Sequence, residues 1–170
     1  MKLAFSSNAY MHFSIEDTIR KIGELGYSGI EVLADVPHAW PSFLLEERKQ
    51  SVRGDLGDHD LQGANVNACM MNAVADPRQP YWHPGWTDTE QRYRAIRRGH
   101  TKRALQLAKE IGAPNLTTEP GGLLTDDQSW ADGADLFYEE LMPCVEVAEK
   151  LNVALLIEPE PELLIEKLGQ

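Results

Sequence analysis

The chain has 170 residues and a formal net charge of −11, with 42% hydrophobic and 25% charged residues. This length and composition are typical of one globular domain with its own core. The acidic balance disfavours a protein that grips nucleic-acid phosphates, since such binding needs a basic face. No apolar run reaches the ~20 residues of a membrane span, and the N-terminus lacks a signal-peptide pattern. We therefore expect a cytoplasmic protein with neither nucleic-acid nor membrane partners.

The first part of the chain alternates short apolar runs with amphipathic segments. A short strand is expected at residues 3–5, followed by a helix that Ser14 opens and Gly26 closes. Isoleucines three or four residues apart form one apolar face of this helix. A second strand is predicted at residues 29–33, and a weaker, polar helix at about residues 45–61.

The middle of the chain repeats the same order. Gly63 is expected to close the polar helix, and an apolar run predicts a third strand at residues 64–71. A long loop with Pro and Trp residues covers about residues 72–88. The clearest helix follows and ends at Gly112, and a fourth strand is predicted at residues 115–118.

The last helical region covers about residues 130–151 and contains Pro143, which should kink or split the helix because proline removes a donor and clashes with the preceding turn. Asn152 ends it, and a fifth strand is predicted at residues 153–157. Strands that alternate with helices predict an α/β fold with a parallel sheet. Two architectures fit: an open doubly wound sheet, or the first five-eighths of a (β/α)8 barrel.

The turn after the first strand favours the barrel. Nucleotide-binding open sheets often carry a glycine-rich turn there, whereas residues 6–10 read SSNAY. The third helix also carries a basic cluster, which we expect on a solvated outer face: Arg92, Arg94, Arg97, Arg98, Lys102 and Arg103. Cys69 and Cys144 lie in apolar runs and are expected to be reduced core residues.

Carboxylates at strand ends are the first candidates for chemistry. Glu158 follows the fifth strand and Glu119 follows the fourth, each directly before a proline. A carboxylate at the C-terminal end of a parallel strand can bind a divalent cation or move a proton, although a solvated surface Glu is the alternative. Glu31 lies inside the second strand, where we favour a structural pair with a basic residue.

The loop after the third strand carries Tyr81, Trp82, His83, Pro84 and Trp86, of which His83 and Trp86 are the chosen candidates. Aromatic rings beside an imidazole suit sugar binding, because apolar sugar faces pack on rings while hydroxyls need polar partners. A loop that packs its own aromatic residues on the domain is the alternative. His38, after the second strand, has a similar but weaker case.

Four stretches resemble the xylose isomerase-like TIM-barrel superfamily of sugar phosphate isomerases and epimerases. They are LAFSSNA at residues 3–9, LGYSGIEVL at residues 25–33, TEPGG at residues 118–122 and LLIEPEP at residues 155–161. The resemblance covers essentially the whole chain. It implies a (β/α)8 barrel with one divalent metal (Mn, Mg or Co), and proton transfer beside a sugar carbonyl.

The resemblance also implies roles for particular residues. Glu158 matches the family's strand-five Glu and is expected to be both metal ligand and catalytic acid/base. Through their own positions at strand ends and in the loop, rather than through the resemblance, His83, Trp86, Glu119 and Glu160 are the expected substrate-binding residues. The family's other metal ligands lie on strands six to eight, which have no counterpart before Gln170. We therefore expect residues 1–170 to form a single incomplete barrel domain, inactive alone and able to self-associate through open sheet edges.

Other functions stay open at this point. A non-catalytic sugar-binding or interaction module would bind without metal. An apurinic endonuclease-like hydrolase is disfavoured, because the third and fourth strands do not end in His. A complete flavodoxin-like domain would place the first strand in the centre of the sheet. Nothing in the sequence separates a free sugar from a sugar phosphate.

Overall fold

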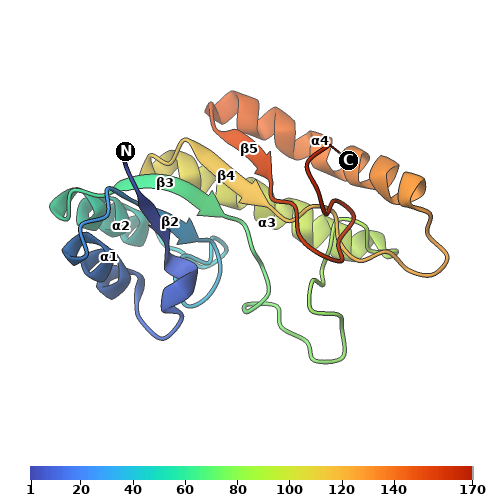
Figure 1. Ribbon diagram of the computed structural model, residues 1–170, viewed down its shortest axis with the longest axis horizontal. Coiled ribbons are helices and arrows are strands. Elements are labelled where there is room, and N and C mark those ends of the chain that lie inside the picture. Colours follow the sequence, from blue (N-terminus) through green and yellow to red (C-terminus); the bar gives the residue numbers. More distant parts are fainter. Residues whose placement is uncertain (170) are drawn as a thin grey trace.

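The computed structural model describes residues 1–169 as a five-stranded parallel sheet with four long helices (Figure 1). The strands are β1 (Ala4–Ser6), β2 (Gly29–Leu33), β3 (Gln62–Asn67), β4 (Asn115–Thr118) and β5 (Ala154–Ile157). The helices are α1 (Ile15–Glu24), α2 (Glu46–Asp58), α3 (Gln91–Ile111) and α4 (Trp130–Leu151), with a short 3-10 helix at Ser7–Tyr10. None of these helices combines the length and apolarity of a membrane span.

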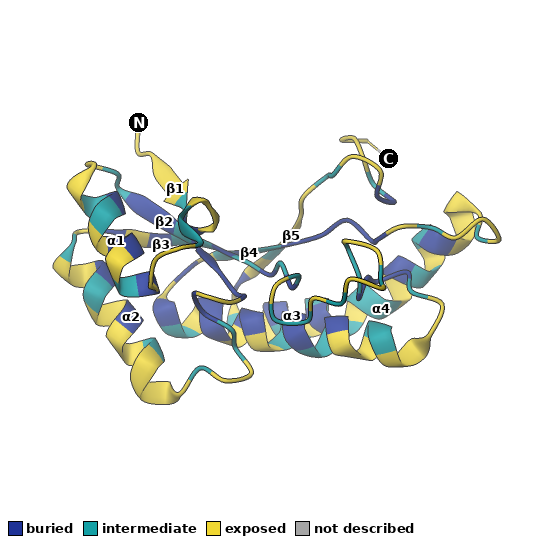
Figure 2. Cartoon of the chain, turned by 90° about the horizontal axis from the view of Figure 1, so that it is seen from below, coloured by how far each residue is buried: buried dark blue, intermediate teal, exposed yellow. Residues whose placement is uncertain are grey.

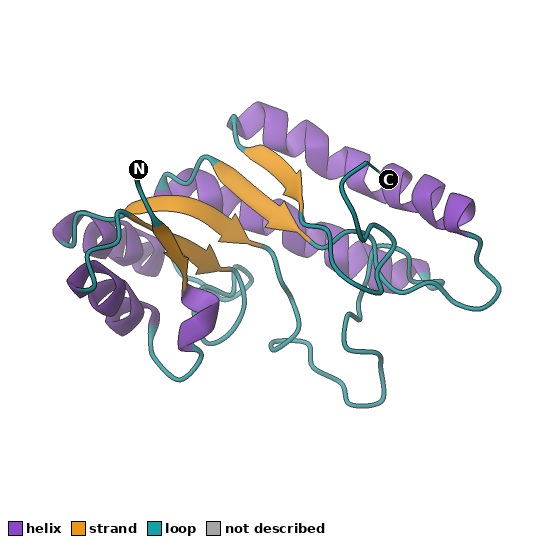
Figure 3. Ribbon diagram, in the orientation of Figure 1, coloured by secondary structure: helices purple, strands orange, loops and turns teal. Residues whose placement is uncertain are grey.

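The strands lie side by side in sequence order, β1-β2-β3-β4-β5. The helices that connect them cover one face of the sheet, and the other face carries no helix (Figures 2 and 3). Each strand–helix unit therefore advances in the same direction, as in a (β/α)8 barrel. The flavodoxin-like alternative is wrong, because it requires β1 in the centre of the sheet. The predicted partial barrel of five strands and four helices is confirmed.

The hydrophobic core lies between the sheet and the helices. Ile30 and Val32 of β2, Val66 of β3 and Leu116 of β4 are fully buried there. They alternate along each strand with residues of the opposite face, as the pleat requires. Complete burial of each such side chain contributes about 1.5–3 kcal/mol, so this layer is the main source of stability.

The opposite face of the sheet is polar and open. Glu31 accepts hydrogen bonds from Ser6 Oγ at 2.6 Å and from Asn65 Nδ2 at 2.7 Å. Asn65 Nδ2 also donates to Thr117 Oγ1 at 2.9 Å, so one polar layer crosses β1 to β4. The expected pairing of Glu31 with a basic residue is wrong, because neutral donors from the neighbouring strands hold this carboxylate.

Local signals set most helix ends. The backbones of Gly26, Gly112 and Asn152 are left-handed, with φ of 81°, 81° and 55°, as predicted for residues that end helices. Gly63 is a correction, because it lies inside β3 rather than at the end of α2. Asp60, with φ of 54°, makes that turn instead.

Two element boundaries also differ from expectation. β3 ends at Asn67 rather than near residue 71, because Asn67 Oδ1 accepts the Cys69 amide and turns the chain out of the sheet. α4 runs unbroken through Pro143. The carbonyl that loses its donor belongs to Glu139, an exposed residue, so water can replace the missing hydrogen bond.

The sheet has β1 and β5 as its edges within the described chain. On β5, Leu156 and Ile157 are exposed. An uncovered strand edge with apolar side chains is a site where chains can pair. Self-association through these edges stays a prediction, which light scattering would test.

Candidate functional site

A hollow of about 540 Å³ lies at the carboxyl ends of the strands, on the polar side of the sheet. Four carboxylates line it: Glu31, Glu119, Glu158 and Glu160. Two aromatic residues of the β3–α3 loop, Tyr81 and Trp82, border the same hollow. No Lys, Arg or His is among the described residues that line it. The sheet therefore presents an acidic, partly aromatic recess where parallel α/β proteins bind ligands.

Glu158 follows β5 directly. Its amide donates to the Thr118 carbonyl at 3.1 Å, which extends the pairing of β4 with β5 up to the hollow. Burial raises the pKa of the Glu158 carboxyl, and the nearby charges of Glu31, Glu160 and Glu119 raise it further. A carboxyl with a raised pKa is suited to give and take a proton.

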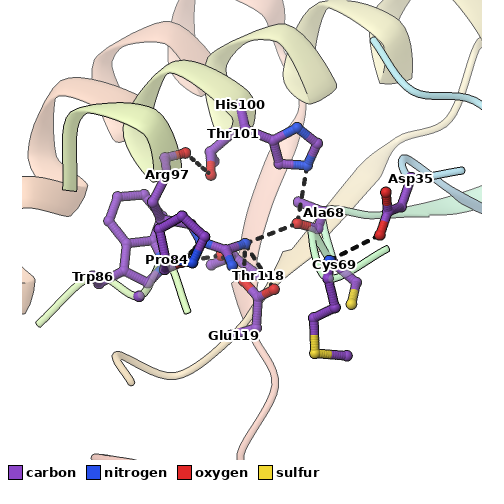
Figure 4. Close-up of polar contacts among 12 residues, drawn as sticks. Asp35, Ala68, Cys69, Pro84, Trp86, Arg97, His100, Thr101, Thr118 and Glu119 are labelled. Carbon is purple, nitrogen blue, oxygen red and sulfur yellow. Dashed lines mark hydrogen bonds and ion pairs between the residues drawn. The ribbon is translucent and has the colours of Figure 1, made fainter. Parts of the chain in front are cut away.

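Glu119 follows β4 and is held differently (Figure 4). Nη1 of Arg97, on α3, donates to both Glu119 carboxylate oxygens at 2.7 Å. Thr118 Oγ1 adds a contact of 3.2 Å to Oε2. Arg97 is 1% exposed and Glu119 8%, so the ion pair is almost fully removed from solvent. The predicted site residues Glu119, Glu158 and Glu160 thus lie together in the hollow.

The placement of Arg97 corrects one expectation. We expected the whole basic cluster of α3 on a solvated face, but Arg97 points into the protein (Figure 4). Arg94 and Arg98 contact Glu140 of α4 instead, and so tie the two helices together. The sequence contained a signal for this burial. The apolar stripe of α3 includes Ala104, and residue 97 lies seven positions earlier on the same helical face.

Trp86 is also a correction. Its side chain is fully buried, packs edge-on against Phe137, and donates from Nε1 to Thr118 Oγ1 at 3.1 Å. It therefore supports the end of β4 from behind and does not line the hollow. Tyr81 and Trp82, with ring centroids 5.2 Å apart, line the hollow where we expected Trp86.

His83 lies outside the hollow as well. It borders a smaller cavity of about 210 Å³ between the β3–α3 loop and the residues after β4. Its Nδ1 lies 3.0 Å from Asp88 Oδ1, and its ring packs edge-on against Tyr93 at 4.2 Å. The expected contact of His83 with a ligand in the hollow is therefore not made in this arrangement.

Burial disfavours the charged forms of both cysteines and of His38 and His100. Cys69 lines the hollow, and burial raises the pKa of its thiol to about 12, so it is not a thiolate nucleophile at neutral pH. Cys144 is buried, and both cysteines are free, as predicted. His38 is buried, and burial lowers its pKa. Burial also lowers the pKa of His100, to about 3, with the charges of Arg97 and Arg103 adding to the effect.

The described side chains offer few ligands for a metal ion. Within residues 1–169, no group of three or more His, Cys, Asp or Glu side chains is arranged to hold a metal. Glu158 supplies carboxylate oxygens to the hollow, but Mg²⁺ requires six ligands in near-octahedral geometry. The described side chains therefore do not form a metal centre by themselves.

Comparison with protein families gives one match, to the family described as xylose isomerase-like TIM barrel, over residues 19–168. No curated protein matches the chain. Many solved structures share its fold, and those described below have 15–17% sequence identity to it. Identity at this level supports the fold and does not transfer a substrate.

A D-tagatose 3-epimerase-like protein superposes with a TM-score of 0.74 at 17% identity, over 95% of this chain and 54% of that protein. A 3-keto-D-glucoside 4-epimerase from E. coli superposes at 0.69 and 16% identity, over 94% and 56%. The IOLI protein, whose structure contains a bound zinc atom, superposes at 0.69 and 15% identity, over 97% and 54%. The chain thus spans about half the length of these structures.

Proposed function

This chain belongs to the xylose isomerase-like TIM-barrel family, and on that premise we propose that its hollow binds a small sugar for isomerisation or epimerisation by proton transfer beside the carbonyl group. One observation carries the proposal: Glu119, Glu158 and Glu160 meet two aromatic rings in a single recess at the carboxyl edge of the sheet. The solved structures of similar fold include sugar epimerases.

Glu158 is the residue to which we assign the proton transfer. Its carboxyl lies at the end of β5 and borders the hollow, and its pKa is raised by burial and by three neighbouring carboxylates. A raised pKa brings a carboxyl closer to the pH at which it exchanges protons efficiently. In the proposed reaction this carboxylate takes a proton from the carbon next to the carbonyl, and the electron pair of that C–H bond moves to the carbonyl oxygen to give an enediolate. Return of the proton to the former carbonyl carbon, with transfer of the neighbouring hydroxyl proton to its oxygen, completes an isomerisation. Epimerisation would need a second acid on the opposite face of the sugar.

The lining of the hollow favours an uncharged sugar over a sugar phosphate. Carboxylates accept hydrogen bonds from hydroxyl groups, and the Tyr81 and Trp82 rings offer surfaces on which an apolar sugar face can pack. A phosphate would face four carboxylates, with no cationic side chain among the described lining residues. We propose a free ketose as the first substrate to test.

A divalent metal has no assigned role in this proposal. The family resemblance implies Mn, Mg or Co, but the described side chains do not form the required ligand set. We predict that Mn²⁺ binds this chain no more tightly than about 1 mM, a weak-site value. Titration followed by electron paramagnetic resonance measures this, and Glu158→Gln is the control for the carboxylate. Micromolar binding that Glu158→Gln abolishes would contradict the prediction.

Deuterium exchange tests the proposed reaction. D-tagatose is incubated with the protein in D₂O, and NMR follows the loss of the proton next to the carbonyl. Although the incomplete barrel was expected not to complete epimerisation, removal of a proton needs only one carboxylate. We therefore expect exchange with the wild-type chain and a loss of at least about 100-fold in Glu158→Gln, since a missing acid/base group typically costs 10²–10⁴ in rate. Exchange that Glu158→Gln leaves unchanged would rule out the assigned role.

A sugar-binding module without catalysis is the second candidate, and the thin metal donor set favours it. It predicts that D-tagatose binds in the presence of EDTA and that Trp82→Ala weakens this binding, while no deuterium exchange occurs. Calorimetry with EDTA, run beside the exchange experiment, separates the two functions. Tyr138→Ala is the control for loss of an aromatic ring, because Tyr138 is exposed on α4 and lies outside the hollow.

A further inference from the structure

Three segments that border the hollow converge on one buried guanidinium. We propose that Arg97 is a positioning residue that holds Glu119 in place as a hydrogen-bond acceptor for one hydroxyl of the bound sugar. This inference rests on the proposed function and deepens it, because it assigns a recognition role to a carboxylate that takes no part in proton transfer.

We call the hydrogen bonds of Arg97 with Ala68, Pro84 and Glu119 the Arg97 clasp. Nη1 donates to both oxygens of Glu119 and, at 3.2 Å, to the Ala68 carbonyl just beyond β3. Nε donates to the Pro84 carbonyl at 2.8 Å, in the loop that also carries Tyr81 and Trp82. One side chain therefore joins the chain after β3, the β3–α3 loop and the end of β4 (Figure 4).

Stability alone does not account for a buried pair of this kind. Burial of two charges carries a desolvation cost that their attraction often only balances, and apolar residues of similar volume are commonly as stable. Glu119 is the only member of the pair that reaches the hollow. The pair therefore places the Glu119 carboxylate in the lining of the hollow, while the Arg97 guanidinium stays buried outside it.

The hydrogen bonds already made by Glu119 limit what it can offer to a ligand. An ionised carboxylate has about four acceptor positions. Arg97 occupies one on each oxygen, and Thr118 Oγ1 occupies another on Oε2. The position left over is on Oε1. Glu119 is thus prepared for one hydroxyl donor.

Tethering of the loop is the second part of the clasp. The Trp86 amide donates to the Gly121 carbonyl at 2.7 Å, which joins the loop to the chain just after Glu119. Arg97 supports the same junction through Pro84. Removal of the guanidinium should therefore loosen Glu119 and the junction between Trp86 and Gly121 beside it.

A double-mutant cycle tests the proposal by calorimetry with D-tagatose. We expect Glu119→Gln to weaken binding by about 10- to 100-fold, the effect of a lost charged hydrogen bond. Arg97→Met should weaken it by a similar factor, while Arg97→Lys should recover part of the loss. Because Arg97 acts through Glu119, the double variant Arg97→Met/Glu119→Gln should bind within about twofold of Glu119→Gln.

Two results would overturn the proposal: additive losses in the double variant, or unchanged affinity in folded Glu119→Gln. Arg98→Met is the matched control, since Arg98 lies one residue away, contacts Glu140 and does not reach the hollow. Its affinity should equal that of the wild type. If Arg97→Met does not fold, we compare Arg97→Lys and the double variant instead. The double variant has no unpaired buried charge and should fold.

Hydrogen exchange separates this proposal from the proposed function. The Trp86 amide should lose protection in Arg97→Met and keep it in Arg98→Met, whether or not a sugar binds. Absence of binding by the wild-type chain would contradict the proposed function and the recognition role of Glu119, whereas Trp86 protection would still decide whether Arg97 holds this junction. Unchanged Trp86 protection in Arg97→Met would overturn the clasp alone.

Discussion

β4 and β5 are each followed by a Glu-Pro dipeptide, but the two glutamates have different surroundings. Glu119-Pro120 and Glu158-Pro159 each place a carboxylate at the carboxyl edge of the sheet. Glu119 is paired with a buried guanidinium, whereas Glu158 has no cation among the causes of its pKa shift and is surrounded by three other carboxylates. Equivalent positions on neighbouring strands can thus serve recognition and proton transfer respectively.

The difference comes from what lies behind each strand end. α3 and the β3–α3 loop cover the end of β4, and they bring Arg97 and Trp86 against Thr118 and Glu119. β5 pairs only with β4 in the described chain, so Glu158 is more open to solvent. Tertiary surroundings, rather than the Glu-Pro dipeptide, decide the chemistry of each carboxylate.

The largest expected effect breaks the ion pair at the β4 end. Arg97→Met should lower the free energy of unfolding by about 3–5 kcal/mol, because it leaves the Glu119 charge buried without a partner. Urea denaturation measures this loss. Arg98→Met should cost under about 1 kcal/mol, the usual range for a partly exposed pair. Equal losses of unfolding free energy in the two variants would show that the buried Arg97–Glu119 pair matters no more for stability than the partly exposed Arg98–Glu140 pair.

A smaller effect is expected in the turn that follows Glu119. Gly121 has φ of 106°, and an added Cβ would lie 2.7 Å from Leu164 Cβ. Gly121→Ala should therefore cost roughly 2 kcal/mol through backbone strain and crowding. Gly54→Ala is the control, because Gly54 lies in α2 with open space around it and the substitution should stabilise by up to about 1 kcal/mol. A neutral Gly121→Ala in thermal unfolding would contradict this reading.

The smallest effect concerns Glu158 and depends on pH. Its pKa is raised above the ordinary value of 4.5, so the folded chain holds this proton to higher pH than the unfolded chain does. The stability from this group is fully present below pH 4.5 and is lost as the pH rises through the folded pKa.

Glu158→Gln should therefore melt at or slightly above the wild-type temperature near pH 7, and the difference should disappear near pH 4. Thermal scans across this range measure it. A variant that is clearly less stable near pH 7 would mean that the Glu158 charge has a stabilising partner, and the contrast with Glu119 would fail.

Much of the fold could be predicted from local patterns. The bounds of β2, β4 and α4 match the expected ranges, and Ser14 caps α1 by accepting the Asp17 amide at 3.1 Å. These features depend on neighbours within a few residues, so the sequence shows them directly. The end of β3 was missed because two side chains fix the segment after it. Asn67 turns the chain, and Asp35, far away in sequence, accepts amides such as that of Met71 at 2.8 Å.

The site could be predicted only in part. Glu119, Glu158 and Glu160 reach one hollow because the carboxyl ends of parallel strands meet at one edge. Among the aromatic residues of the β3–α3 loop, Trp86 was chosen over Tyr81 and Trp82, since loop composition does not show which ring lines the hollow. Arg97 was grouped with its solvated neighbours although helical spacing aligns it with the buried stripe of α3.

The sequence by itself determined the alternation of strands and helices, their family resemblance and the position of carboxylates at strand ends. The alternation and the carboxylate positions follow from periodicity, capping and strand polarity, which act over short stretches of chain, whereas the resemblance rests on four sequence stretches. Only the tertiary structure decided which carboxylate is paired and which is left open to exchange protons. Charge pairing and burial depend on side chains brought together from distant segments, as Arg97 and Glu119 are, and no local pattern contains that information.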